Sequence, residues 1–183
     1  MKKFFILLIS FLFFISCSHR YTDTKNKYSI PIPALFNIYQ TNLDQDLDSH
    51  IEKFINTQFV DVVLYDNSTR VNPSLVTIAS YPRFINITKI NSDPAIEEDF
   101  LNEIIMKYGN GTFVNKGTYS YKRLMVAFFN YSFFYEGTDY SYQVSFLSGS
   151  IASTQSIYYI AKENSKEMIE NSVLDIIKGY RRH

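Results

Sequence analysis

A chain of 183 residues, with 18 basic residues balancing 18 acidic ones, suits one domain and offers no broad basic field to nucleic acid. Its aromatic content of 17%, with 15 Tyr and 16 Phe, excludes a disordered chain, which would be poor in these residues. The single Cys excludes an intramolecular disulfide and a cysteine zinc site, so its position is the feature to explain.

The first 16 residues have the parts of a secretion signal. Lys2 and Lys3 give a positively charged start, and residues 4–15 form an apolar run that only Ser10 interrupts. This run is shorter than the roughly 20 apolar residues that a membrane-spanning helix needs, which favours a signal segment. Removal of the signal leaves 16 basic against 18 acidic residues, so the mature chain is slightly acidic.

The apolar run is followed by Ser16 and then by the only Cys of the chain, Cys17. Here the chain resembles the bacterial lipoprotein precursors, whose lipobox places a small residue before an invariant cysteine, although the family usually has Leu at the position of Phe14. The resemblance implies cleavage between Ser16 and Cys17, with acyl chains on Cys17 that hold the mature protein on a membrane outside the cytoplasm. Under the enteric sorting rule, Ser18 favours the outer membrane. An ordinary cleaved signal and an uncleaved anchor are the alternatives, but neither explains where the Cys lies.

Residues 17–27, the lipidated Cys and a polar stretch without periodicity, predict a tether. A single globular domain is predicted over residues 28–183, and it opens with a strand over residues 28–32. Residues 49–52 then have the spacing of a capping box and begin an amphipathic helix. The apolar face of this helix consists of Ile51, Phe54, Ile55 and Phe59.

Three further strands and a central helix come next. Asp93 is predicted as the N-cap of this helix, Pro94 as its first residue and Gly109 as its end. We interpret its acidic residues as a solvated face rather than as paired catalytic acids. The strands are predicted over residues 60–65, 75–80 and 84–90, the apolar stripe of the helix is Ile96, Phe100, Ile104 and Tyr108, and the acids are Glu97, Glu98, Asp99 and Glu103.

The last part of the chain predicts an antiparallel meander and a closing helix. Turn residues at 136–138 and 148–150 separate long strand-like runs. The closing helix ends in cations, which the negative end of a helix dipole favours. The strands are predicted over residues 112–115, 122–135, 140–147 and 156–160, and the helix runs from Asn164 through Ile169, Val173, Ile176 and Ile177 to Tyr180, with Arg181 and Arg182 at its end.

Helices set among hairpins predict an α+β fold, an antiparallel sheet covered by helices. The domain resembles the PsbP-like superfamily, which includes the extrinsic photosystem protein and small bacterial lipoproteins. The features that carry the resemblance are the strand at 28–33, the helix at 94–108, the meander at 121–159 and the closing helix around 172–177. It implies an α/β/α sandwich and an accessory or binding role, with no family site to transfer. A lipocalin-like barrel is the alternative fold, disfavoured because three helices are too many for it.

The predicted meander carries aromatic side chains on both strand faces. One face must be core, and the other, if a helix leaves it uncovered, would form an aromatic surface suited to a protein, glycan or lipid partner. The alternative is that helices cover both faces. The residues of this candidate surface are Phe129, Tyr131, Phe133, Tyr135, Tyr140 and Tyr142.

One acidic run resembles the start of a calcium loop. Asp44, Asp46 and Asp48 alternate, but the sixth position of the loop is then Ser49 and the twelfth Ile55, where Gly and Glu are needed. We interpret the run as a solvated approach to the first helix.

Other catalytic and metal patterns are also incomplete. His19, His50 and His183 are too scattered for a shared metal or a catalytic dyad, and residues 148–150 lack the glycines of a nucleophile elbow. The sequence therefore predicts no metal, no cofactor and no catalytic residue.

Together these features predict a lipid-anchored accessory or binding protein of the bacterial cell envelope that is not an enzyme. It would meet membrane lipid through the acylated Cys17 and would not bind nucleic acid. Two alternatives stay open. One is an envelope enzyme whose carboxylates or hydroxyls assemble only in the fold, and the other is a structural surface lipoprotein without a specific ligand.

Overall fold

The structure is a computed structural model that describes residues 19–40, 45–55, 60–69, 72–81, 85–150 and 153–183. The predicted signal, Ser16 and Cys17 lie outside the described residues. Cleavage and lipidation at this junction therefore stay predictions.

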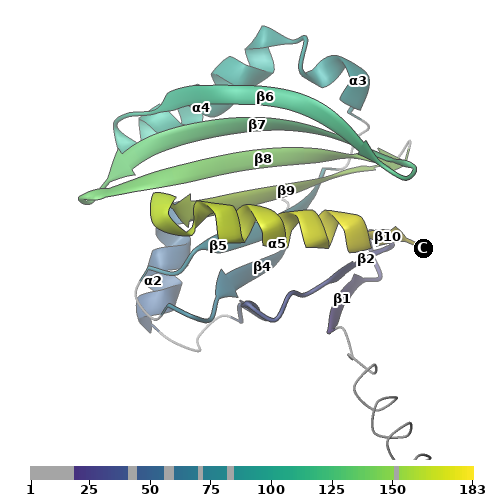
Figure 1. The fold of residues 1–183 in the computed structure, drawn as a ribbon, viewed down its shortest axis with the longest axis horizontal. Helices are drawn as coiled ribbons and strands as arrows, with labels where there is room; N and C mark the ends of the chain where they lie inside the picture. Colours follow the sequence, from purple (N-terminus) through teal and green to yellow (C-terminus); the bar gives the residue numbers. More distant parts are fainter. Residues whose placement is uncertain (1–18, 41–44, 56–59, 70–71, 82–84, 151–152) are drawn as a thin grey trace, which may run out of the picture.

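A seven-stranded antiparallel sheet forms the centre of the molecule (Figure 1). Its strand order is β3-β4-β5-β9-β8-β7-β6, so the predicted meander of β7, β8 and β9 is confirmed. Its strands are β3 (Phe36–Ile38), β4 (Val60–Asp66), β5 (Leu75–Tyr81), β6 (Thr112–Tyr121), β7 (Leu124–Tyr135), β8 (Thr138–Ser150) and β9 (Ser153–Lys162). Of these, β3 has no counterpart among the predicted strands.

Two tight turns connect the long strands. The β7–β8 hairpin turns at Glu136 and Gly137, as predicted, and both have the positive φ, 47° and 78°, that a two-residue hairpin turn favours. The predicted turn at 148–150 was wrong, because β8 continues to Ser150. The strand predicted from residue 122 begins two residues later, because Lys122 and Arg123 form the β6–β7 turn.

A smaller sheet of three strands holds both ends of the described chain. It consists of β1 (Arg20–Asp23), β2 (Tyr28–Pro31) and β10 (Arg181–Arg182), and β2 lies in the middle with an antiparallel partner on each side. The predicted tether over residues 17–27 was therefore wrong for Arg20–Asp23, whose backbone pairs with β2. Arg181 and Arg182 belong to β10 rather than to the predicted end of the last helix.

The central helix agrees best with the sequence. Asp93 caps α4 (Pro94–Tyr108) by accepting a hydrogen bond from the Ala95 amide at 3.1 Å, and Gly109 ends it at a φ of 79°. The strand predicted over 84–90 was wrong, because Asn86 caps a short helix over its described end. The other helices are α2 (Gln45–Phe54), α3 (Ile87–Ile90), the 3-10 helix η1 (Glu163–Ser165) and α5 (Lys166–Gly179). None of the helices in the described ranges is long and apolar enough to span a bilayer.

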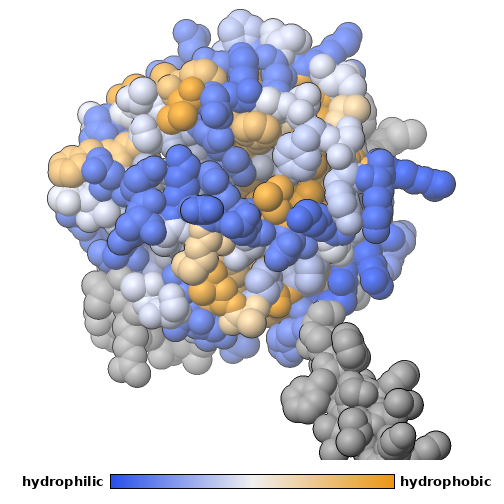
Figure 2. Space-filling view, in the orientation of Figure 1, coloured by the Kyte–Doolittle hydropathy of each residue, from blue (hydrophilic) through white to orange (hydrophobic). Residues whose placement is uncertain are grey.

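The large sheet separates two apolar cores, because alternate residues of each strand face opposite sides. In Figure 1, α5 lies in front of the sheet with β2, and α4 lies behind it with α3. Figure 2 shows a hydrophilic band across the same view, where α5 turns its polar face to solvent. This layering confirms the α+β fold with an antiparallel sheet covered by helices. The barrel alternative was wrong, because β3 and β6 lie at opposite edges of an open sheet.

Candidate functional site

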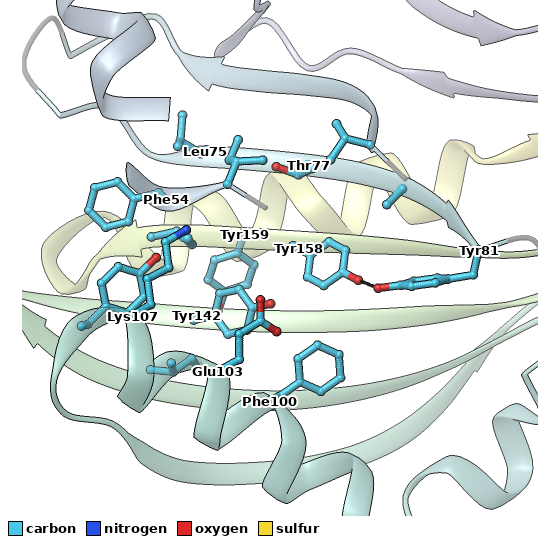
Figure 3. Close-up of a pocket in the computed structure, with 16 residues that line it drawn as sticks. Phe54, Leu75, Thr77, Tyr81, Phe100, Glu103, Lys107, Tyr142, Tyr158 and Tyr159 are labelled. Atoms are coloured by element: carbon cyan, nitrogen blue, oxygen red, sulfur yellow. Dashed lines mark hydrogen bonds between the residues drawn. The ribbon is translucent and has the colours of Figure 1, made fainter. Parts of the chain in front are cut away.

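A pocket of about 150 Å³ lies between α4 and the sheet face that α4 covers (Figure 3). Strand β5 contributes side chains from alternate positions, such as Thr77 and Ala79, and β8 and β9 add Tyr142 and Tyr158. Phe54 and Ile55, at the end of α2, line it as well, and α4 contributes one face of its helix. The pocket thus joins segments that lie far apart in the sequence.

Two opposite charges on α4 lie at the rim of this pocket. Glu103 and Lys107 are exposed residues one turn apart, and both extend from α4 toward the pocket in Figure 3. Within the described part of the chain, neither side chain makes an ion pair or a hydrogen bond. Partial desolvation of the Lys107 ammonium by the surrounding protein lowers its pKa, and the charge of Glu103 opposes that shift. The Lys107 ammonium also lies 5.7 Å from the ring centroid of Tyr108.

Three tyrosines contribute the polar part of the interior. Tyr142 stacks on Tyr158 with ring centroids 6.2 Å apart, and the hydroxyls of Tyr158 and Tyr81 hydrogen-bond to each other (Figure 3). Burial raises the pKa of Tyr142 and of Tyr158, and the charge of Glu103 adds to both shifts. Their hydroxyls are therefore neutral at physiological pH and can donate or accept hydrogen bonds.

Stacked rings form a stiff wall beside the rim. Tyr108 stacks on Phe133 with centroids 4.1 Å apart, and Phe133 stacks on Tyr140 at 5.3 Å. Such pairs contribute about 0.5–1.5 kcal/mol each beyond their buried area. The wall holds the C-terminal end of α4 against the sheet.

The pocket has apolar walls, neutral hydroxyls and, at its rim, two opposite charges that make no ion pair within the described residues. These features suit the binding of a small amphipathic molecule. No His or Cys is among the residues that line the pocket. The arrangement offers a carboxylate for a cationic group and ring faces for an apolar body.

The comparisons with known proteins bear on this fold. No family model matches the sequence, and no curated protein matches it. Among solved structures, the cyanobacterial PsbP protein CyanoP of Synechocystis sp. PCC 6803 superposes with a TM-score of 0.63, at 10% identity, over 90% of this chain and 92% of that chain. The fold is PsbP-like.

Two other solved structures are similar to this chain, with lower TM-scores. LpqN, described as involved in cell envelope biogenesis of Mycobacterium tuberculosis, has a TM-score of 0.55 at 8% identity and covers 88% of both chains. The Ran-binding protein Mog1p of Saccharomyces cerevisiae has a TM-score of 0.51 at 7% identity, over 90% of this chain and 94% of its own. At these identities the likeness concerns the PsbP-like fold alone.

The predicted aromatic surface was wrong, because this PsbP-like fold uses it as core. Phe129, Tyr131, Phe133 and Tyr140 are at most 4% exposed, since α2, α3 and α4 cover the face that they share. The two remaining residues of that prediction, Tyr135 and Tyr142, are half-buried. Tyr142 alone of the six lines the pocket.

The acidic residues of α4 have separate roles. Glu97 pairs with Lys116 at 2.7 Å, and Glu98 and Asp99 are exposed, as a solvated face requires. Glu103 is exposed as well, and it also lines the rim of the pocket.

The histidines differ in burial, and the structure describes the acidic run only in part. His50 is buried, whereas His19 and His183 are exposed. Asp44 and the side chain of Asp46 lie outside the described residues. In the part of the chain that the structure describes, no group of three or more His, Cys, Asp or Glu residues could hold a metal ion.

Sequence reasoning missed most of the pocket. Lys107, Tyr81 and Tyr158 were not singled out, and Glu103 was placed in solvent. One signal was available: Glu103 and Lys107 are four residues apart and border the apolar stripe of α4. The tyrosines gave no such signal, because only the pairing of β5 with β9 brings them together.

Proposed function

We propose that this protein is a lipid-anchored accessory protein of the bacterial cell envelope that binds a small cationic amphipathic molecule in the α4 pocket, without a cofactor and without catalysis. The observation that carries the binding role is Glu103, an unpaired carboxylate at the rim of an aromatic pocket. The lipobox at Ser16 and Cys17 supports the anchor. The similarity of this fold to that of LpqN, a protein described as involved in cell envelope biogenesis, is compatible with the location.

The size and chemistry of the pocket limit the ligand. A cavity of about 150 Å³ has room for a body the size of one aromatic ring, since a dry cavity of roughly this volume binds benzene. The carboxylate of Glu103 and the faces of the surrounding rings favour a cation over an anion. Lys107, one turn along α4 from Glu103, would select against a second positive group on the ligand.

Two probes with the same ring and chain test this proposal. Phenethylamine carries a cation and 3-phenylpropionate an anion, and binding of each to the purified protein is measured by calorimetry. We expect phenethylamine to bind more tightly, and Glu103→Gln to weaken its binding about tenfold, as loss of one charge-assisted hydrogen bond worth roughly 1.5 kcal/mol requires. Lys107→Gln should leave phenethylamine binding unchanged or stronger.

The controls separate the pocket from the helix surface. Glu98→Gln removes the same charge from the exposed face of α4 and should not change binding. Ala79→Leu fills the pocket and should abolish the binding of both probes. Tight binding that survives Ala79→Leu would show that the ligand site lies elsewhere.

The anchor is tested by replacing Cys17 with Ser, which keeps the leader intact but removes the only thiol in the chain. The wild-type protein should partition into detergent and take up labelled fatty acid, and Cys17→Ser should take up none. A clipped variant should be soluble, because stable anchoring needs the acyl chains. A variant that is still labelled and membrane-bound would refute the lipobox assignment.

A further inference from the structure

A second groove, of about 520 Å³, lies where the end of α5 and β10 meets the β6–β7 hairpin. Among its lining residues none is acidic, within the described part of the chain, and five are cationic. Hydrophilic side chains project from the right-hand edge of Figure 2, where Figure 1 places this hairpin and the C-terminal end. The cations that line the groove are Lys122, Arg123, Lys178, Arg181 and Arg182.

These cations have few counter-charges of their own. Arg123 and Arg181 are exposed, and in the described residues their side chains make no ion pair or hydrogen bond. Lys178 lies 3.9 Å from Asp175 in an exposed pair, which contributes little. Lys122 forms the tip of the hairpin at a φ of 54°, a conformation that favours Gly. The fold therefore gathers positive charge at one place and leaves it open to an outside anion.

The groove lies at the end of the domain from which the chain leads to Cys17. The Arg20 guanidinium donates a hydrogen bond to the carbonyl oxygen of Gly179, which lines the groove, at 2.8 Å. Burial lowers the pKa of Arg20, and the nearby charge of Arg181 lowers it further. Two residues lie between Cys17 and Arg20, so the chain takes three steps of at most about 3.5 Å each between them. The backbone of Cys17 is thus within roughly 10 Å of that of Arg20.

We propose that this basic groove binds the anionic headgroups of phospholipids and holds the domain in one orientation on the membrane. The inference rests on the proposed lipid anchor, which would bring the groove to the level of the headgroups. Lys and Arg pair well with phosphate, and basic residues beside a lipid anchor add to membrane attachment. Such attraction is effective only within a Debye length, about 8 Å in physiological salt, so the short connection to Cys17 is what makes it strong.

The test uses the full chain as purified from membranes, mixed with vesicles of phosphatidylcholine alone or of phosphatidylcholine with phosphatidylglycerol. A water-soluble acetylating reagent then reports the exposure of each lysine by mass spectrometry. Labelling of Lys122 and Lys178 should fall several-fold in the anionic vesicles and recover in high salt. Lys89, an exposed residue on α3 at the other side of the sheet, should be labelled equally in both.

Charge reversal at the hairpin provides the matched variant. Lys122→Glu combined with Arg123→Glu should remove the protection of Lys178, because the groove loses its attraction for the surface. Lys53→Glu combined with Lys89→Glu makes the same change in charge on α2 and α3 and should leave the protection intact. Both pairs are exposed, so neither variant disturbs the core.

Flotation of the vesicles separates this proposal from the anchor. Protein that floats with both vesicle types but shows equal labelling overturns the groove proposal and leaves the anchor standing. Protein that floats only with anionic vesicles supports the groove and refutes the anchor, and protein that floats with neither refutes both. Protection seen on native membranes but not on anionic vesicles assigns the groove to an acidic protein and overturns the lipid proposal.

Discussion

His50 shows how burial sets the charge of a single side chain. It is 6% exposed, its ring lies 4.8 Å from that of Phe54, and its Nε2–H donates to the carbonyl oxygen of Pro73 at 2.9 Å. The pKa of His50 is lowered chiefly by burial, and Lys162 and Lys53 add to the shift. The bond to Pro73 and the charge of Glu136 oppose it. The folded protein therefore holds a neutral imidazole at this position.

A neutral buried histidine makes stability depend on pH. Its pKa in the folded protein lies below the ordinary value of 6.5, so between those two values the unfolded chain binds more protons than the folded one. The contribution of the neutral His50 to stability should be complete above pH 6.5 and should decrease as the pH falls toward its pKa in the folded protein. His50→Gln keeps a donor for Pro73 without a titrating group, and its melting temperature should decrease less over this range. Parallel curves for the two proteins would contradict the prediction.

For single residues, the sequence predicted correctly those features that depend on a local repeating pattern. The stripe of Ile104 and its neighbours on α4 was found, because a helix repeats every 3.6 residues. The direction of Glu103 was not, because a charge bordering that stripe faces solvent or a pocket according to what lies opposite. Opposite it are Tyr142 and Tyr158, on strands whose register the sequence left open.

Two elements were predicted correctly because caps or turns mark their ends, whereas the capping box predicted at 49–52 lies inside α2 (Gln45–Phe54). Asp93 and Gly109 define α4, and Glu136 and Gly137 define a hairpin. β3 and β10 were missed because they are short, with 3 and 2 residues, and are held by their partner strands rather than by pattern. α3 was taken for a strand because its β-branched residues resemble one, whereas the cap at Asn86 makes it a helix.

The end of α5 packs so closely on β2 that its last residue must be small. A Cβ at Gly179 would lie 2.5 Å from Cγ and 2.8 Å from Cδ of Pro31, whose ring cannot move aside. Gly179→Ala should therefore destabilise the protein by about 1–3 kcal/mol, measured by urea unfolding. Asn171→Ala, on the exposed face of the same helix, should change stability by less than about 0.5 kcal/mol. If Gly179→Ala is as stable as that control, the contact with β2 is looser than described.

Across the whole molecule, one carboxylate joins the two sheets. Asp61 lies at the register shift between Val60 and Val62 on β4, and its Oδ2 accepts hydrogen bonds from Tyr28 on β2 at 2.9 Å and from Ser80 on β5 at 2.6 Å. Burial raises the pKa of Asp61 even though both hydroxyls stabilise its charged form. This half-buried carboxylate, shared by both sheets, fixes how they meet.

Removing the Asp61 carboxylate should lower the free energy of unfolding more than replacing it with a neutral amide. Asp61→Ala leaves the hydroxyls of Tyr28 and Ser80 buried without this partner, so we expect a loss of about 2–3 kcal/mol in the free energy of unfolding. Asp61→Asn keeps polar atoms in place and removes the half-buried charge, so its loss should be under about 1 kcal/mol. Equal losses in the two variants would show that the charge itself holds the sheets together.

The small sheet also decides when the fold can be completed. β2 is bordered by β1 and by β10, and Arg20 bonds to Gly179 across 159 residues of chain. The long hairpins need only neighbouring segments, so they can form while the chain is still being delivered. The second edge of β2 stays open until Arg181 and Arg182 emerge. The hairpin of β1 and β2 can form early, and the small sheet is completed only when β10 pairs with the other edge of β2.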